Sequence, residues 1–116
     1  MLSTKNKITT NKIYQRLNLT AEKLEKFCQG NDIIELSLFG SILREDFNNN
    51  SDIDLLVVFD PIQKKKMSLI DLVEIQYQLE DLTYRKIDLI EKQTIINSHN
   101  WIRRQNILNT AQIIYE

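Results

Sequence analysis

Two aspartates stand two positions apart where an apolar run begins. Asp52 and Asp54 enclose Ile53, and the run continues to Phe59. Side chains two positions apart on a β-strand project from the same face, so these carboxylates are expected to lie close together. Paired carboxylates repel each other unless a cation or a shared proton neutralises them, and an oxygen-only ligand set suits Mg²⁺. The pair indicates a magnesium site, although a single acidic pair is also typical of a solvent-exposed strand end.

A glycine-serine pair follows an earlier apolar run, Ile33 to Phe39. Gly40 permits a close backbone approach, and Ser41 is expected to cap a short helix whose first amides could bind phosphate oxygens. Arg44 lies one turn into that helix and could reach the same anion, with a surface ion pair to neighbouring acids as the alternative. Because Mg²⁺ usually completes its shell with water and phosphate oxygens, the pattern predicts that a nucleotide completes the site.

A third carboxylate lies in a later alternating stretch, Arg85 to Glu91. Ile87 and Leu89 share one face of the predicted strand, and Asp88 lies on the other. Asp88 could complete a metal shell or take a proton from an attacking hydroxyl, provided that its strand neighbours the strand of Asp54. The alternative is an edge-strand acid that discourages aggregation.

Helical and strand-like stretches alternate along the chain and must position these residues. The first part of the chain is expected to form a loose arm over residues 1–10, a short helix around Ile13 and Leu17, and a helix from Thr20 to Gly30. Two strands follow, over Ile33 to Phe39 and Ile53 to Phe59, and then a helix that begins with a capping box of Ser68 and Asp71. The last part is expected to form a strand over Arg85 to Glu91, a helix starting near Trp101 and a short final strand. The order predicts an α/β fold with a small mixed sheet and flanking helices.

Length and composition exclude several classes. The 116 residues suffice for one domain, and we divide them into an N-terminal arm and short helix (1–19) and a main domain (20–116). A formal net charge of −1 gives no basic field for direct nucleic acid binding. No stretch approaches the roughly 18 apolar residues of a membrane span, and Cys28, the only cysteine, reads as a small buried hydrophobe. A cytoplasmic location is expected.

The combined motif resembles a known family. Gly40-Ser41, ten intervening residues and Asp52-Ile53-Asp54, with Asp88 on a later strand, is similar to the nucleotidyltransferase superfamily of DNA polymerase β, and specifically to its minimal nucleotidyltransferase (MNT) branch. The resemblance runs from about Leu24 through LSLFGS, SDIDLLV and RKIDLI to the closing IRRQNILNTAQIIYE. It implies a polymerase β-like nucleotidyltransferase core in residues 20–116.

The resemblance also implies a function. Asp52 and Asp54 would hold two Mg²⁺ ions, Asp88 would join one of them and could act as base, and the Gly-Ser turn would bind the triphosphate of ATP. Such proteins are antitoxins encoded beside a HEPN-domain ribonuclease toxin, and they transfer AMP from ATP to a tyrosine hydroxyl of that toxin. One departure is Glu45, where many relatives have glycine, which brings a further negative charge near the expected phosphate path.

Two other functions fit the same residues. The chain could be an antitoxin that acts by direct binding without catalysis, or a small-molecule adenylyltransferase of the aminoglycoside type. A small core with one catalytic edge would also expose apolar area suited to a partner complex or a homodimer.

Overall fold

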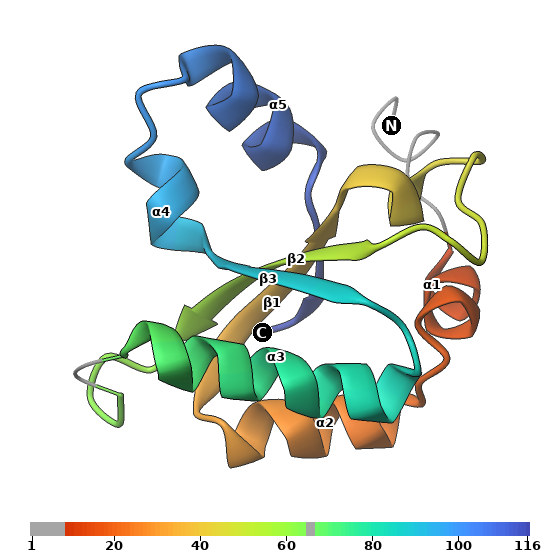
Figure 1. Ribbon diagram of the computed structural model, residues 1–116, viewed down its shortest axis with the longest axis horizontal. Coiled ribbons are helices and arrows are strands. Elements are labelled where there is room, and N and C mark those ends of the chain that lie inside the picture. The colour runs from red at the N-terminus through yellow and green to blue at the C-terminus, as the bar shows by residue number, and fades with distance from the viewer. Residues whose placement is uncertain (1–8, 65–66) are drawn as a thin grey trace.

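A four-stranded mixed sheet forms the centre of the protein (Figure 1). The structure, a computed structural model, describes residues 9–64 and 67–116. Strand β1 (Ile33–Phe39) pairs antiparallel with β2 (Ile53–Phe59) on one side and with β4 (Gln112–Tyr115) on the other, while β3 (Ile87–Glu91) pairs in parallel with β2. The order β3-β2-β1-β4 confirms the predicted mixed sheet. Residues 1–8 of the predicted arm lie outside the described part.

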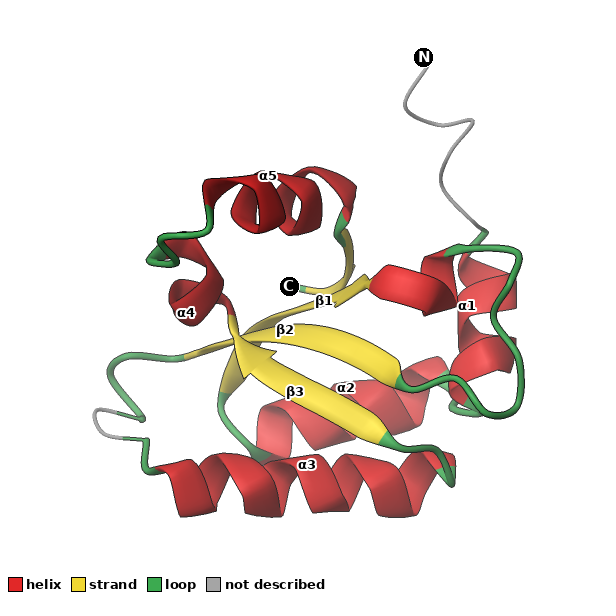
Figure 2. Cartoon of the chain, turned by 45° about the horizontal axis from the view of Figure 1, so that its top comes forward, coloured by secondary structure: helices red, strands yellow, loops and turns green. Residues whose placement is uncertain are grey.

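Helices cover both faces of this sheet (Figure 2). Helices α2 (Ala21–Gly30) and α3 (Leu69–Thr83) lie against one face, and α4 (Lys92–Ile96) and α5 (Trp101–Thr110) lie over the other. Helix α1 (Thr10–Leu17) precedes them and packs near one end of the sheet. Within the described residues, no helix has the length and apolar character needed to cross a membrane.

Local signals in the sequence explain where the longer helices begin. The Thr20 hydroxyl accepts a hydrogen bond from the Lys23 amide (3.2 Å) at the start of α2. Ser68 and Asp71 form the predicted capping box at the start of α3, each side chain accepting from the backbone amide of the other (both 3.1 Å). These caps satisfy amides that have no partner within the helix.

The main core lies between the sheet and helices α1, α2 and α3. Alternate residues of β2 and β3 are buried there, including Ile53, Leu55, Ile87 and Leu89. The short helix α1 contributes Ile13 and Leu17, each 1% exposed, so it packs as part of this core. Cys28 is fully buried here, and burial raises the pKa of its thiol to about 12, as expected for a residue that acts as a small hydrophobe.

A second, smaller core lies on the opposite face of the sheet. Phe39 of β1, Leu56 of β2, Ile95 of α4 and Ile107 of α5 form it. Leu56 is two positions after Asp54, so the two side chains project from the same strand face. This small core therefore fixes α4 and α5 on the face that carries the aspartates.

Candidate active site

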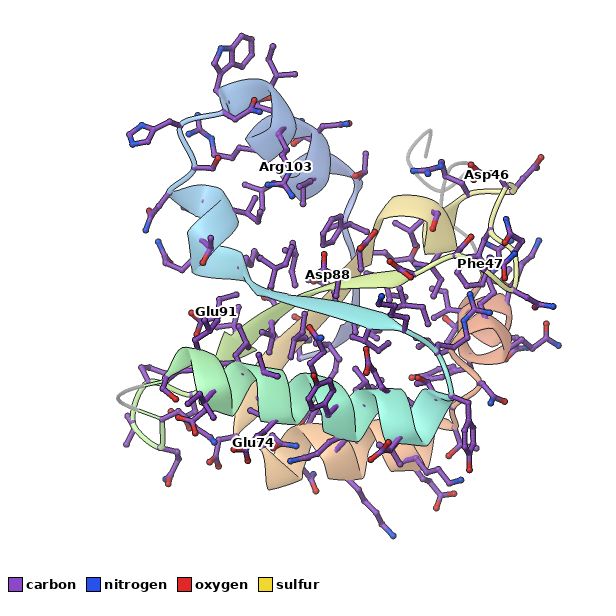
Figure 3. The ribbon with its side chains drawn as sticks, viewed as in Figure 1. Asp46, Phe47, Glu74, Asp88, Glu91 and Arg103 are labelled. Atoms are coloured by element: carbon purple, nitrogen blue, oxygen red, sulfur yellow. The ribbon has the colours of Figure 1, made fainter. Side chains whose placement is uncertain are left out.

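The three predicted aspartates come together on two neighbouring strands. Strands β2 and β3 run parallel, and their register places Asp54 directly beside Asp88. Asp52 immediately precedes β2, and Figure 3 shows Asp88 on the sheet. The condition set by the sequence, that these two strands be neighbours, is met. Strand β3 is also at the sheet edge, so the alternative role of Asp88 as an edge-strand acid is compatible with the same position.

The electrostatics of Asp54 reflect this crowding. Burial raises the pKa of its carboxyl, and the negative charges of Asp88 and then Asp52 raise it further. Asp54 is half-buried, whereas Asp52 and Asp88 are exposed. The charges of Asp88 and Asp52 thus disfavour the ionised form of Asp54, a repulsion that a hard cation would relieve.

The donor set at this point fits magnesium in its chemistry. All three side chains offer only carboxylate oxygens, which Mg²⁺ prefers. In residues 9–64 and 67–116, no three acidic, histidine or cysteine side chains already stand in a metal-binding arrangement. The exposed side chains of Asp52 and Asp88 would therefore have to change rotamer to share an ion with Asp54, which surface carboxylates do at low cost.

Gly40 is required by its contact with Asp54. Its φ of +79° lies in the left-handed region, which glycine adopts without strain. A Cβ atom at position 40 would overlap Oδ2 of Asp54 and lie 3.4 Å from its Cγ. The glycine turn therefore packs directly against the carboxylate of Asp54, and any larger residue at position 40 would displace that carboxylate.

Ser41 does not form the helix cap that the sequence predicted. The chain after β1 forms a single 3-10 turn, Gly40–Leu43, whose N-cap residue is Phe39 and which has no side-chain cap. Ser41 lies inside this turn, and its hydroxyl donates to the backbone carbonyl of Asp52 (3.4 Å). The prediction that Ser41 caps a helix through Arg44 or Glu45 was wrong, because the glycine turn itself begins the 3-10 segment. Ser41 instead links the turn to the start of β2.

Arg44 forms the surface ion pair that was one of its two predicted interactions. Its Nε donates to Oδ1 of Asp46 (3.1 Å) in an exposed ion pair, which was the structural alternative. Its positive charge also lowers the pKa of Asp54, against the larger raising effects of burial and of the other carboxylates. The contact of Arg44 with an anion stays a prediction. Glu45, the departure from the family pattern, is exposed.

Phe47 organises the segment between the glycine turn and the aspartates, and sequence reasoning missed it. Two guanidinium groups lie over its ring, with Cζ of Arg85 at 4.5 Å and Cζ of Arg16 at 5.2 Å from the ring centroid. Figure 3 shows Phe47 beside α1. The two arginines also donate to backbone carbonyls of the segment: Arg16 to Ile42 and Arg44 (both 2.6 Å), Arg85 to Asn48 (2.8 Å) and Ser51 (2.7 Å). No local spacing could have predicted this, because the arginines come from distant parts of the chain.

Arg103 of α5 is a second residue that the sequence did not single out. Its charge lowers the pKa of Asp54, although its effect ranks below that of Arg44. Figure 3 shows Arg103 on the side of α5 that is turned to the sheet, with Asp88 below it. The site thus combines three carboxylates with arginines from two different elements.

Comparison with known proteins agrees with this geometry. The nucleotidyltransferase domain family matches residues 21–114. Protein adenylyltransferase MntA of Thermococcus cleftensis is 34% identical over 77 residues, which are 66% of this chain and 73% of MntA. MJ1217 of Methanocaldococcus jannaschii, named as a candidate protein adenylyltransferase, is 40% identical over 65 residues. That match covers 55% of this chain and only 61% of the length of MJ1217.

Solved structures share the fold. A crystal structure of a toxin-antitoxin with AMP-PNP matches with a TM-score of 0.63 and 21% identity, over 84% of this chain and 73% of that chain. A candidate minimal nucleotidyltransferase matches with a TM-score of 0.59 and 24% identity, over 79% and 86%. Together with the family match, these similarities confirm the family resemblance of the motifs: the chain belongs to the nucleotidyltransferase domain family and is related to its minimal nucleotidyltransferases.

Proposed function

We propose that this protein is a Mg²⁺-dependent nucleotidyltransferase that transfers AMP from ATP to a tyrosine hydroxyl of a partner protein. The observation that carries the proposal is the placement of Asp54 beside Asp88 on adjacent parallel strands, with Asp52 close enough to raise the pKa of Asp54. Such a carboxylate cluster is unfavourable on its own and is useful around cations. Its position beside a glycine turn supports a site for a metal-bound nucleotide.

In this proposal the three aspartates bind metal, and Asp88 has a possible second role as base. Asp52 and Asp54 would hold the two Mg²⁺ ions, and Asp88 would join one of them or act as base. When bound, Mg²⁺ neutralises the carboxylates and stabilises negative charge on phosphate oxygens. The tyrosine oxygen forms a bond to the α-phosphorus of ATP as the bond from that phosphorus to the bridging oxygen breaks. Pyrophosphate leaves, and Asp88 takes the phenolic proton when it acts as base.

The glycine turn and Arg44 would hold the phosphates. Gly40 leaves room for the Asp54 carboxylate beside the turn, and Ser41 holds that turn against the start of β2. The turn is too short to contribute a helix dipole, so its support for an anion would come from individual amides and from the guanidinium of Arg44. Arg44 would exchange its exposed ion pair with Asp46 for a phosphate contact at small cost.

The partner proposal is supported by the names of relatives. MntA of Thermococcus cleftensis is named a protein adenylyltransferase, and similar solved structures are MntA-HepT toxin-antitoxin complexes. We propose accordingly that this chain is the antitoxin of a HEPN-domain toxin and that the acceptor tyrosine lies on that toxin. A cytoplasmic location belongs to the same proposal.

The position of the label in ATP tests the reaction. The protein would be incubated with Mg²⁺ and the HEPN protein encoded beside it, using ATP labelled at either the α- or the γ-phosphate. Label transferred only from α-labelled ATP supports AMP transfer, and label from γ-labelled ATP would contradict it. If neither label is transferred while the two proteins still co-elute, neutralisation by direct binding is favoured. Transfer to an added aminoglycoside would favour the small-molecule alternative.

A further inference from the structure

Arg103 has an unusual environment among the arginines of the chain. All five lie in the described residues, and four guanidinium groups have hydrogen-bond partners there: Arg16 with Ile42 and Arg44, Arg44 with Asp46, Arg85 with Asn48 and Ser51, and Arg104 with Ser98. For Arg103, the structure gives no hydrogen bond or ion pair of the guanidinium with any residue in 9–64 or 67–116. The side chain is exposed. Its charge is therefore available to a ligand.

The backbone that carries Arg103 is held firmly. The Asn100 side chain accepts a hydrogen bond from the Arg103 amide (3.1 Å) and caps α5. Nη1 of Arg104 donates to the carbonyl of Ser98 (2.8 Å), which fixes the turn before the helix. Further along α5, Ile107 is buried in the small core. Local hydrogen bonds thus fix the start of the helix, and Ile107 attaches the helix to the small core.

The periodicities of helix and strand place Arg103 over the carboxylates. Arg103 precedes Ile107 by four positions, so both lie on the side of α5 that faces the sheet. Asp54 precedes Leu56 by two positions on one face of β2, and Leu56 packs in the same core as Ile107. Figure 3 shows Arg103 on the side of α5 that is turned to the sheet, above Asp88. Arg103 and the glycine turn therefore approach the aspartates from different elements, α5 and the β1-β2 connection.

We propose that Arg103 is a nucleotide-binding residue that contacts the triphosphate from the α5 side of the site. The inference rests on the proposed function, since it requires a nucleoside triphosphate as substrate. Three carboxylates repel a free triphosphate, so a fixed cation on the same face offsets part of that repulsion. A guanidinium can donate two parallel hydrogen bonds to phosphate oxygens, and α5 fixes the backbone of Arg103 while its guanidinium has no hydrogen-bond partner among the described residues.

Calorimetric titration with α,β-methylene-ATP, which cannot transfer AMP, tests this role. Wild type, Arg103→Gln and Arg103→Lys would be titrated in the presence of Mg²⁺. Lys26→Gln is the matched control, because it removes one exposed positive charge from α2, on the opposite face of the sheet. We expect roughly tenfold weaker binding for Arg103→Gln, an intermediate loss for Arg103→Lys and wild-type affinity for Lys26→Gln. Thermal unfolding of each variant checks that the fold is retained.

The titrations distinguish a failure of the proposed role of Arg103 from a failure of the proposed nucleotide site. Equal affinity of wild type and Arg103→Gln would overturn the role of Arg103 and leave the nucleotide site intact. Tighter Mg²⁺ binding by Arg103→Gln without nucleotide, with unchanged nucleotide affinity, would also overturn it, because Arg103 would then only neutralise the carboxylates. A wild-type protein that binds no nucleotide would overturn both this inference and the proposed function.

Discussion

Gly40, the first residue after β1, is in direct contact with Asp54 of the neighbouring strand β2. Phe39 is the cross-strand partner of Asp54, so the residue after Phe39 lies beside the Asp54 side chain. The carboxylate occupies the space that a Cβ atom at position 40 would need. The fixed spacing between the glycine turn and the aspartate pair thus corresponds to a contact in the fold.

Gly40→Ala should reduce AMP transfer far more than it reduces stability. The alanine methyl group would displace the Asp54 carboxylate, and the positive φ would cost about 1 kcal/mol of stability. Transfer activity and urea unfolding would measure the two effects. Gly30→Ala is the control, since a Cβ atom there meets nothing within 4 Å. Full activity of Gly40→Ala would show that the contact is unimportant for the site.

Without metal, Asp54 should make the protein less stable as the pH rises. The pKa of Asp54 is raised in the folded state, so above its ordinary value the folded state binds more protons than the unfolded state. The free energy of unfolding therefore falls as the pH rises from that ordinary value through the raised pKa. Urea unfolding in EDTA at several pH values would show this slope in wild type and a smaller slope in Asp54→Asn. Identical slopes would mean that Asp54 titrates normally.

Magnesium should stabilise the wild-type protein and have little effect on Asp52→Asn combined with Asp54→Asn. A ligand that binds only the folded state stabilises by RT ln(1 + [L]/Kd), which is about 2.7 kcal/mol at a hundredfold excess over Kd. Thermal unfolding with increasing MgCl₂, and then with EDTA, measures the effect. Equal stabilisation of wild type and the double variant would place the metal elsewhere.

Replacing Phe47 by leucine should loosen the segment between the glycine turn and the aspartates. Leucine keeps an apolar side chain but removes the ring over which Arg16 and Arg85 lie. We expect a loss of about 1 kcal/mol in stability and a higher KM for ATP. Denaturant unfolding and steady-state kinetics would test both. Phe59→Leu, in strand β2, serves as a control for a general loss of aromatic packing.

The sequence predicted those strands and helix starts that depend on a local pattern of residues. An apolar run identified β2, alternation identified β3, and the side-chain types of Ser68 and Asp71 identified the start of α3. Residue chemistry and the family resemblance together predicted a shared role for the three aspartates, but the parallel pairing of Asp54 with Asp88 is a long-range property that only the folded structure reveals. Helix α4 was missed because its five residues are too few for a periodic signal.

Residues that act across long sequence separations could not be predicted. Arg16 and Arg85 meet at Phe47 although nearly 70 positions separate them in the chain. Arg103 reaches the site because Ile107 attaches α5 to the small core. Ser41 was assigned the wrong partner because a helix cap is the commonest local use of serine after glycine, whereas its actual partner, the carbonyl of Asp52, is set by the sheet.

The most direct test of the central claim is the intact mass of the partner protein. The HEPN protein would be incubated with ATP, Mg²⁺ and either wild type or the combined Asp52→Asn and Asp54→Asn variant, and then weighed by mass spectrometry. The account predicts a shift by whole AMP units with wild type and no shift with the variant. An equal shift with both proteins, or none with either while the complex persists, would contradict the claim that these aspartates carry out AMP transfer.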